Sequence, residues 1–296
     1  MEVSGMNDNI KIEEIDRRSN LTRREFVDAY QRPNKPVIFT DLTKDWIARE
    51  KYTLDYFRSE HGDRVAHIEG TPYKLGDYID LLEKATVDNP APYPCKLDLR
   101  EDFKDLVKDV QPRPAVMYPD RTHSKLIPRR FVGGLADLEI FFGGPGSKFP
   151  YLHYDYLGLY AFIHQMHGDK EFTVYAPDQQ EFLYVKKDEP WISEMENHQS
   201  PDLEKYPLYA QAKGIKFVAH AGETLFIPKL WYHTARSLTP TISVASDQLC
   251  HFNWDIFVKE CTEHSRRSPL KAVLAKATLI AAGLALDIKE RLQGGL

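Results

Sequence analysis

The amino-acid sequence predicts a mainly β protein, a barrel or jelly roll with helices before and after it. Short segments rich in β-branched and aromatic residues, each bounded by Gly or Pro, follow one another in the middle of the chain: 159–163, 171–175 and 224–228. A series of short strands of this kind is typical of an antiparallel barrel or jelly roll. With 296 residues and 42% hydrophobic content, the chain can bury the core of such a barrel as one domain.

The segment before the barrel strands is expected to pack around them. Residues 1–10 are polar and acidic, which predicts a disordered tail, and they lack the apolar segment of a secretory signal. Short strands are expected after them at 37–39 and 65–68. The predicted helices between and around these strands are 22–30, 53–60, 75–85 and 101–110. We expect this lead-in to complete one of the sheets, which gives one domain over residues 11–252.

The most informative motif is a His-x-Asp pair, His153 and Asp155. In a strand, residues two apart point to the same face, so both side chains would project into one pocket while Tyr154 points away. A third candidate, His233, comes much later in the chain, and a barrel can bring it back beside His153. Two histidines and one carboxylate that leave three coordination positions open form the set with which non-haem Fe(II) oxygenases hold iron, co-substrate and dioxygen.

Several segments around these residues resemble the JmjC and cupin-like branch of the Fe(II)- and 2-oxoglutarate-dependent oxygenases. The resemblance covers roughly residues 11–250. The matching stretches are 21–26, 32–38, 141–147, 153–155, 165–170, 175–177 and 221–233. The resemblance implies a double-stranded β-helix, a jelly roll of the cupin type. It also implies that His153, Asp155 and His233 are the iron ligands.

The resemblance further implies that Lys170 binds the distal carboxylate of 2-oxoglutarate, as a cationic point charge at the end of the pocket. Two positions around this co-substrate depart from the family pattern. Pro150 stands where a Thr or Ser is common, and no Asn accompanies the lysine among residues 162–164. Replacement hydrogen bonds are expected from His164, Tyr151, Ser243 or Ser246.

These residues predict a hydroxylase for a C–H bond of a protein, peptide or small-molecule substrate. N-demethylation stays open, because hydroxylation of an N-methyl group releases formaldehyde. Two other hypotheses are a metal-binding cupin that does not use 2-oxoglutarate, for which Lys170 is incidental, and a non-catalytic binding protein of the same fold. Members of the resembling family act on protein side chains, natural products and modified RNA bases, so the sequence leaves the substrate class open.

Composition restricts the partners and the compartment. A formal net charge of −5 provides no overall attraction to phosphate backbones, so extended nucleic-acid binding is not expected. The cysteines, Cys95, Cys250 and Cys261, are odd in number and lack CxxC spacing. This pattern indicates reduced thiols and a cytoplasmic protein.

A long insert at 184–215 separates two barrel strands and carries Trp191, His198, Tyr206 and Tyr209. Loops at the mouth of a rigid barrel often contact the substrate, although a packed surface excursion is the simpler interpretation. The remaining histidines near the barrel strands are not expected to act as a fourth ligand. They are His164, His167 and His220.

The carboxy-terminal segment, residues 253–296, is predicted to be helical. Ser268 and Pro269 suit an N-cap and a first helical position, and Gly294–Gly295 suit a stop after a helix over 269–292. Apolar residues recur at helical spacing at Leu270, Val273, Leu274, Ala277, Ala281, Leu284 and Ile288. The apolar run 277–286 is too short to cross a bilayer, so no membrane span is expected. The stripe is expected to pack on the chain's own barrel or to pair with a second copy as a homodimer.

Overall fold

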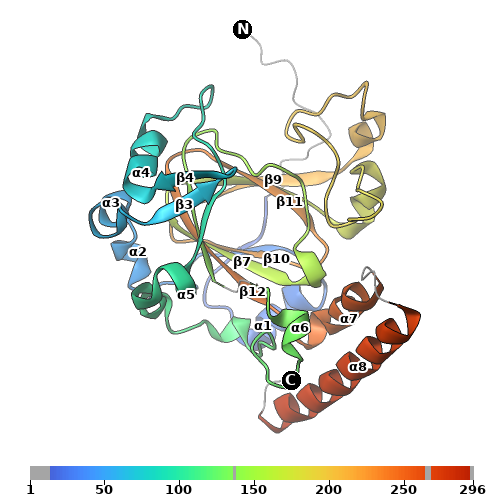
Figure 1. Cartoon of the computed structure of the whole chain (residues 1–296). Helices are drawn as coiled ribbons and strands as arrows, with labels where there is room; N and C mark the ends of the chain where they lie inside the picture. The colour runs from blue at the N-terminus through green and yellow to red at the C-terminus, as the bar shows by residue number, and fades with distance from the viewer. Residues whose placement is uncertain (1–13, 136–137, 264–267, 294–296) are drawn as a thin grey trace.

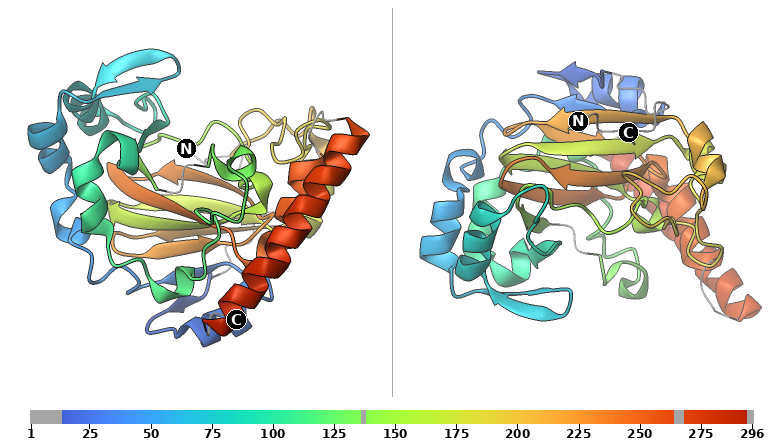
Figure 2. Two further views of the ribbon diagram at one scale, coloured as in Figure 1. Left: turned by 60° about the horizontal axis from the view of Figure 1, so that its bottom comes forward. Right: turned by 90° about the horizontal axis from the view of Figure 1, so that it is seen from above.

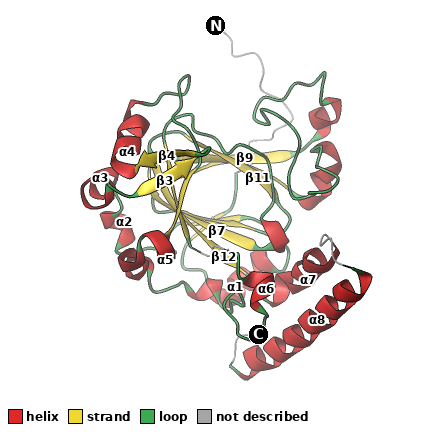
Figure 3. Cartoon of the chain, viewed as in Figure 1, coloured by secondary structure: helices red, strands yellow, loops and turns green. Residues whose placement is uncertain are grey.

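The computed structural model describes residues 14–135, 138–263 and 268–293, so the predicted tail at 1–10 lies outside the described residues. Two β-sheets face each other and enclose the centre of the molecule, and helices lie on the outside (Figure 1). With strands and helices coloured separately, the barrel stands out from its helical cover (Figure 3). The predicted mainly β, jelly-roll fold is confirmed.

The large sheet contains seven strands in the order β1-β2-β10-β7-β12-β6-β5. Their bounds are β1 Arg17–Arg18, β2 Val37–Phe39, β10 Thr224–Ile227, β7 Tyr160–His167, β12 Thr241–Gln248, β6 Glu139–Gly143 and β5 Cys95–Asp98. Neighbours are antiparallel except β1 and β2, which pair parallel. Strand β2 pairs with β10, so the lead-in completes this sheet as predicted.

The small sheet has the order β11-β8-β9, with β11 Tyr232–Ser237, β8 Lys170–Tyr175 and β9 Gly214–Ala219. A separate hairpin joins β3 Val65–Ile68 to β4 Thr71–Lys74. The chain passes from the large sheet to the small one through a tight turn at Gly168, whose φ is +70°. A Cβ atom at this position would lie 2.0 Å from the carbonyl oxygen of Pro240, so only glycine fits.

Alternate residues of β7 face opposite sides of the strand, one side toward the cavity and the other toward an aromatic core. Ala161 and Ile163 face the interior cavity. Tyr160 and Phe162 face the opposite way and pack with Phe26 in a separate aromatic core. Successive side chains of a strand point to opposite faces, and both faces of β7 are covered.

Short helices precede β6; α1 to α5 pack against the large sheet, whereas α6 packs with the two helices that follow the barrel. Their bounds are α1 Arg23–Phe26, α2 Ala48–Lys51, α3 Leu54–His61, α4 Leu75–Lys84, α5 Leu99–Asp102 and α6 Arg129–Val132. Thr22 begins α1 with a capping box to Glu25, and a π-helical turn at Val27–Gln31 continues it, so the predicted helix at 22–30 is present in two parts. The predicted helix at 101–110 is instead α5 followed by a 3-10 turn at Lys104–Val110.

Two helices follow the barrel, α7 Trp254–Glu263 and α8 Pro269–Leu292. The Ser268 hydroxyl accepts a hydrogen bond from the Lys271 amide, so α8 begins as predicted. Helix α8 runs diagonally along one side of the molecule, next to α7 (Figure 2). Gly283 permits this close approach, because a Cβ atom there would lie 2.2 Å from Nε1 of Trp254.

The face of α8 that packs on the protein is not the predicted stripe. The buried residues of the helix are Ala275, Leu279, Ala282, Gly283, Leu286 and Glu290. Among the stripe residues, Leu270 is 69% exposed and Leu284 is 61% exposed. The expectation that the stripe packs on the chain's own barrel is therefore wrong, and the outer face of α8 keeps an apolar row at 270, 274, 277, 281, 284 and 288.

A buried ion pair fixes α8 to the loop before the barrel. Arg121 is 1% exposed and donates to both carboxylate oxygens of Glu290, at 2.7 and 2.6 Å, and to Asp287 at 2.5 Å. Among the described residues, α8 is the helix that length and composition would allow to cross a membrane. Buried core helices of soluble proteins share these two properties, but α8 is mostly exposed. The expectation of no membrane span, which considers only the run 277–286, stays a prediction.

Candidate metal centre and its cavity

His153, Asp155 and His233 converge, and their ligand atoms lie within 4.8 Å of one another. His153 and Asp155 come from the segment between β6 and β7, and His233 is the second residue of β11. Two backbone hydrogen bonds hold the segments together, from the His153 amide to the His233 carbonyl at 3.2 Å and in the reverse direction at 2.6 Å. Within the described ranges, no other group of three His, Cys, Asp or Glu side chains has this geometry.

The polar atoms of this triad suit a bound cation. Nδ1 of His153 and Oδ2 of Asp155 are buried without a hydrogen-bond partner. Nδ1 of His233 lies 3.0 Å from the carbonyl oxygen of Trp231, so Nδ1 carries the proton and Nε2 keeps its lone pair. Nε2 is 3.9 Å from Oδ2 of Asp155. Unpaired buried polar atoms are costly in the absence of a ligand, and a divalent metal, which would take one ligand atom from each of the three residues, would offset this cost.

Burial also sets the protonation of the triad. It lowers the pKa of His153 well below its ordinary value, and the neighbouring His233 lowers it further, so the imidazole stays neutral and able to donate its lone pair. Burial raises the pKa of Asp155, while His233 acts in the opposite direction. A carboxylate at this position therefore needs a nearby positive charge to remain ionised.

The side chain between the two ligands anchors the segment from behind. Tyr154 points away from the metal triad, as predicted, and its hydroxyl donates to Oε1 of the buried Glu260 on α7 at 2.6 Å. Its ring also meets the ring of Tyr232 edge to face, with centroids 5.1 Å apart. Because Tyr232 precedes His233, this contact ties the two ligand-bearing segments to each other.

Lys170 lies in the same cavity as the triad and is almost completely buried, with 5% exposure. Its ammonium group is 3.2 Å from the Ser243 hydroxyl, 3.4 Å from the Tyr93 hydroxyl and 5.8 Å from the ring of Phe141. The described residues provide it with no carboxylate partner within salt-bridge distance. Burial lowers the pKa of this amine to about 8. A buried cation without a counter-ion is a site for an anionic ligand.

A cavity of about 380 Å³ connects the triad with Lys170. Apolar side chains line much of it, and they are Phe141, Phe149, Ile163 and Phe172. Phe141 lies at the lysine, and the ring of Phe149 stacks on the imidazole of His153 with centroids 4.7 Å apart. The predicted co-substrate residues Tyr151 and Ser243 also line the cavity. The Tyr151 ring contacts the imidazole of His153 edge to face, at 5.1 Å between centroids.

His164 and Ser246 do not line this cavity, so the predicted co-substrate contacts of these residues are corrected. The pleat turns His164 to the outer face of β7, where its Nδ1 lies 3.0 Å from the Thr224 hydroxyl and its ring contacts Trp46. Sequence reasoning missed two residues at the lysine. Tyr93 reaches it from the proline-rich loop, and Gln165 accepts a hydrogen bond from Ser243 at 2.7 Å.

Of the four singled-out residues of the insert, only Trp191 lines the cavity. His198 is buried with Nε2 at 2.7 Å from the Thr234 hydroxyl, and Tyr206 and Tyr209 pack in the insert's own apolar cluster. The insert is therefore mostly a packed excursion that brings one aromatic side chain to the cavity mouth.

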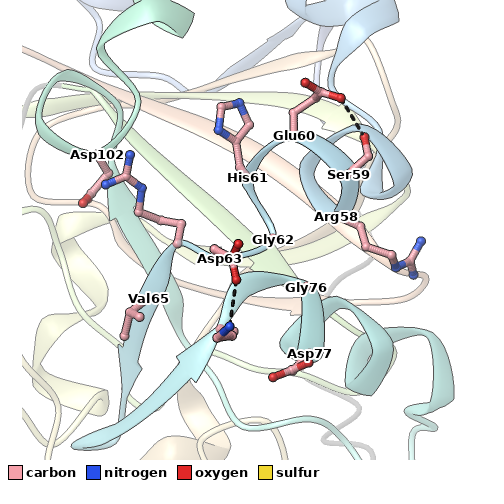
Figure 4. A pocket seen from close by; sticks show the side chains of 12 residues that line it. Arg58, Ser59, Glu60, His61, Gly62, Asp63, Val65, Gly76, Asp77 and Asp102 are labelled. Carbon is pink, nitrogen blue, oxygen red and sulfur yellow. Dashed lines mark hydrogen bonds and ion pairs between the residues drawn. The ribbon is translucent and has the colours of Figure 1, made fainter.

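A second, wider depression of about 810 Å³ lies between α3 and the β3–β4 hairpin (Figure 4). Its charged side chains largely neutralise one another. Lys74 pairs with Asp63 at 2.7 Å, and Arg58 pairs with Asp80 at 3.0 Å. It offers neither a set of converging metal ligands nor a buried unpaired charge among the described residues.

Comparison with known proteins gives a consistent set of relatives. The family model described as a cupin-like domain matches residues 22–246. The lysine-specific demethylase JMJ30 of Arabidopsis thaliana is 27% identical over 248 residues, 78% of this chain and 54% of the relative. The bifunctional peptidase and (3S)-lysyl hydroxylase JMJD7 of Homo sapiens is 25% identical over 252 residues, 72% of this chain and 76% of the relative. The tRNA wybutosine-synthesizing protein 5 of Mus musculus is 25% identical over 241 residues, 75% of this chain and 74% of the relative. The chain thus spans about half of the plant demethylase and about three quarters of the other two.

Proposed function

Because this chain belongs to the cupin-like family of JmjC-type oxygenases, we propose that it is an Fe(II)- and 2-oxoglutarate-dependent hydroxylase of a C–H bond. The observation that carries the proposal is one cavity that contains both an unpaired His-Asp-His triad and a buried, unpaired lysine. The triad suits a divalent cation, and the lysine suits a carboxylate at some distance from it.

His153, Asp155 and His233 would hold the iron, and Lys170 would hold the distal carboxylate of 2-oxoglutarate. Bound Fe(II) supplies the redox chemistry that couples oxidation of 2-oxoglutarate by dioxygen, to succinate and carbon dioxide, with transfer of one oxygen atom to the substrate. The burial of Lys170 limits its contact with water, which strengthens the attraction between ammonium and carboxylate. Ser243 and Tyr93 orient the ammonium group.

The environment of Lys170 disfavours a metal cupin that does not use 2-oxoglutarate. A lysine that only stabilised the fold would not be expected to lie in a cavity with 5% exposure and no acidic partner, since burial of such a charge opposes folding. The lysine is better accounted for by a ligand that brings its own negative charge.

Succinate formation tests the proposal. The full chain is incubated with Fe(II), 2-oxoglutarate and air, together with peptide, metabolite and RNA pools, and succinate and formaldehyde are measured by NMR. We expect succinate that depends on all three reactants and rises with a productive pool, and no formaldehyde. Formaldehyde in step with succinate would indicate N-demethylation instead. Absence of succinate, together with no calorimetric binding of 2-oxoglutarate to the Mn(II)-loaded protein, would overturn the proposal.

A further inference from the structure

A chain of side-chain hydrogen bonds connects Lys170 on the small sheet with two strands of the large sheet. Ser243 on β12 pairs directly with Gln165 on β7, so the two side chains lie next to each other on one face. The Ser243 hydroxyl donates to Oε1 of Gln165 at 2.7 Å, and it lies 3.2 Å from the ammonium nitrogen of Lys170. Gln165 and Ser243 are both fully buried, so the protein itself determines the direction of each bond.

The orientation of the Gln165 amide follows from the groups around it. One side of the amide lies 2.7 Å from the carbonyl oxygen of His167 and 3.1 Å from that of Gly168, in the tight turn just before Lys170. A carbonyl oxygen can only accept, so the side of the amide that faces this turn is the NH2 group. The side that faces Ser243 is therefore the oxygen, which can only accept as well.

The single proton of the Ser243 hydroxyl is thus used by Gln165. Toward Lys170 the hydroxyl presents only lone pairs. Lone pairs suit an ammonium group, because ammonium donates three protons and accepts none. Ser243 and the Tyr93 hydroxyl can accept two of these protons, which leaves the third for a ligand in the cavity.

We propose that Gln165 is a positioning residue for the co-substrate. By holding the proton of Ser243, it makes Ser243 an acceptor for Lys170 and not a donor to the carboxylate that Lys170 binds. The inference rests on the proposed function for the identity of that carboxylate, which is 2-oxoglutarate. It also changes the role of Ser243, for which the sequence predicts a direct hydrogen bond to the co-substrate. Ser243 instead acts on the ligand through the lysine.

The ionisation of Lys170 in the metal-free full chain tests the direction of the hydrogen bond. NMR of protein with isotope-labelled lysine follows the pKa of Lys170, whose signal is the one that Lys170→Met removes. A hydroxyl that accepts from the ammonium stabilises the charged form, so Ser243→Ala should lower the pKa of Lys170. Gln165→Met should lower this pKa too, because the freed hydroxyl can turn its proton toward the lysine. A hydroxyl that donates to the amine would give a higher pKa in Ser243→Ala.

Affinity for 2-oxoglutarate tests whether Gln165 acts through Ser243, and calorimetry on the Mn(II)-loaded full chain measures it. Ser243→Ala should weaken binding by about tenfold, since it removes a hydrogen bond to a charged group. Gln165→Met should weaken binding by no more than that factor. The double variant should bind as well as Ser243→Ala alone, because two residues of one chain of hydrogen bonds are not additive. Affinity for Mn(II) should stay unchanged in all three variants.

Gln248→Met is the matched control. Gln248 is a fully buried glutamine on β12 that donates to the carbonyl oxygen of Pro119 at 3.2 Å, and it does not line the cavity. This variant also loses a buried hydrogen bond to a backbone carbonyl, but it should keep the wild-type pKa of Lys170 and the wild-type affinity for 2-oxoglutarate. Circular dichroism confirms that each variant is folded. Should Gln165→Met fail to fold, Ser243→Ala still decides the direction of the hydrogen bond.

A raised or unchanged pKa of Lys170 in Ser243→Ala would overturn the inference. Losses of affinity that multiply in the double variant would do the same, because Gln165 would then act independently of Ser243. The proposed function can fail separately. In a protein that does not bind 2-oxoglutarate, a pKa of Lys170 that falls in both single variants, and falls no further in the double variant than in Ser243→Ala, would support the inference and reject the proposed function.

Discussion

Replacing Lys170 with Met is expected to stabilise the unliganded protein while removing its affinity for 2-oxoglutarate. Methionine keeps the unbranched stem and fills the same space, but it carries no charge into the cavity. Burial displaces the pKa of Lys170 from 10.5 to about 8, which corresponds to about 3 kcal/mol of unfavourable free energy for the ammonium in the folded state. Lys170→Met removes this penalty, so at pH 7 the unliganded variant should melt roughly 5 °C higher.

Ligand binding should change in the opposite direction. Loss of the cationic partner of a desolvated carboxylate costs on the order of 2–5 kcal/mol, or roughly thirtyfold to several thousandfold in affinity. In the wild type the affinity should also depend on pH. Above about pH 8 the free amine is neutral and must take up a proton to bind a carboxylate, so the affinity should fall by about tenfold per pH unit.

The same pKa shift makes the stability of the unliganded wild type depend on pH. Stability should rise with pH, whereas the affinity for 2-oxoglutarate should fall. The folded-state pKa of Lys170, about 8, lies below the ordinary value of 10.5, so the unfolded chain holds more protons between these two pH values. The free energy of unfolding should therefore rise with pH through this window, and the rise should vanish in Lys170→Met.

Calorimetry on the Mn(II)-loaded protein measures affinity, and urea unfolding at pH 7 and 10 measures stability. Lys216→Met serves as the control, because Lys216 lies opposite Thr173 on the neighbouring strand β9 and pairs with Glu171 at 3.7 Å, away from the cavity. A Lys170→Met protein that is less stable than wild type and binds 2-oxoglutarate normally would refute the reasoning.

Three more predictions concern the metal and the two helices after the barrel. His233→Ala should weaken Mn(II) binding by more than about 100-fold in a folded protein, because loss of a direct ligand costs more than loss of a hydrogen-bond partner of a ligand. Electron paramagnetic resonance measures the binding, and unchanged metal affinity would contradict the ligand assignment. Tyr154→Phe should lower the free energy of unfolding by about 2 kcal/mol, since it removes a buried hydrogen bond to the Glu260 carboxylate, and denaturant titration measures the loss. We also propose that the exposed row on α8 pairs with a second copy of the chain. Light scattering should then report a dimer for the wild type and a folded monomer for the double variant Leu274→Glu, Leu284→Glu, and a monomeric wild type at micromolar concentration would reject the pairing.

Local signals account for what the sequence predicted well. His153 and Asp155 are two residues apart, so any extended backbone places them on one side, and the structure brings both to His233. The start of α8 was predictable for the same reason, because the Ser268 cap and the proline after it act within one turn. Lys170 was reached by resemblance, and its burial gives that assignment a physical basis.

The errors concern features that depend on distant parts of the chain. His164 was placed in the pocket because strand parity was not known, and parity depends on where β7 begins relative to the turn at Gly168. Apolar residues occupy two faces of α8, so periodicity alone could not say which face meets α7. Tyr93 contacts Lys170 from 77 positions away in the chain, a proximity that no local pattern encodes.

The candidate metal ligands lie beside the small sheet, whereas Glu139 of β6 and Asp247 of β12 line the same cavity from the large sheet. A mutation on β6 or β12 can therefore alter what enters the cavity without moving an atom that binds metal. Because the two sets are on different sheets, changes to the cavity wall and changes to the candidate metal ligands can be made independently of each other. For directed evolution, the useful library is small, and it comprises Glu139, Ala245 and Asp247.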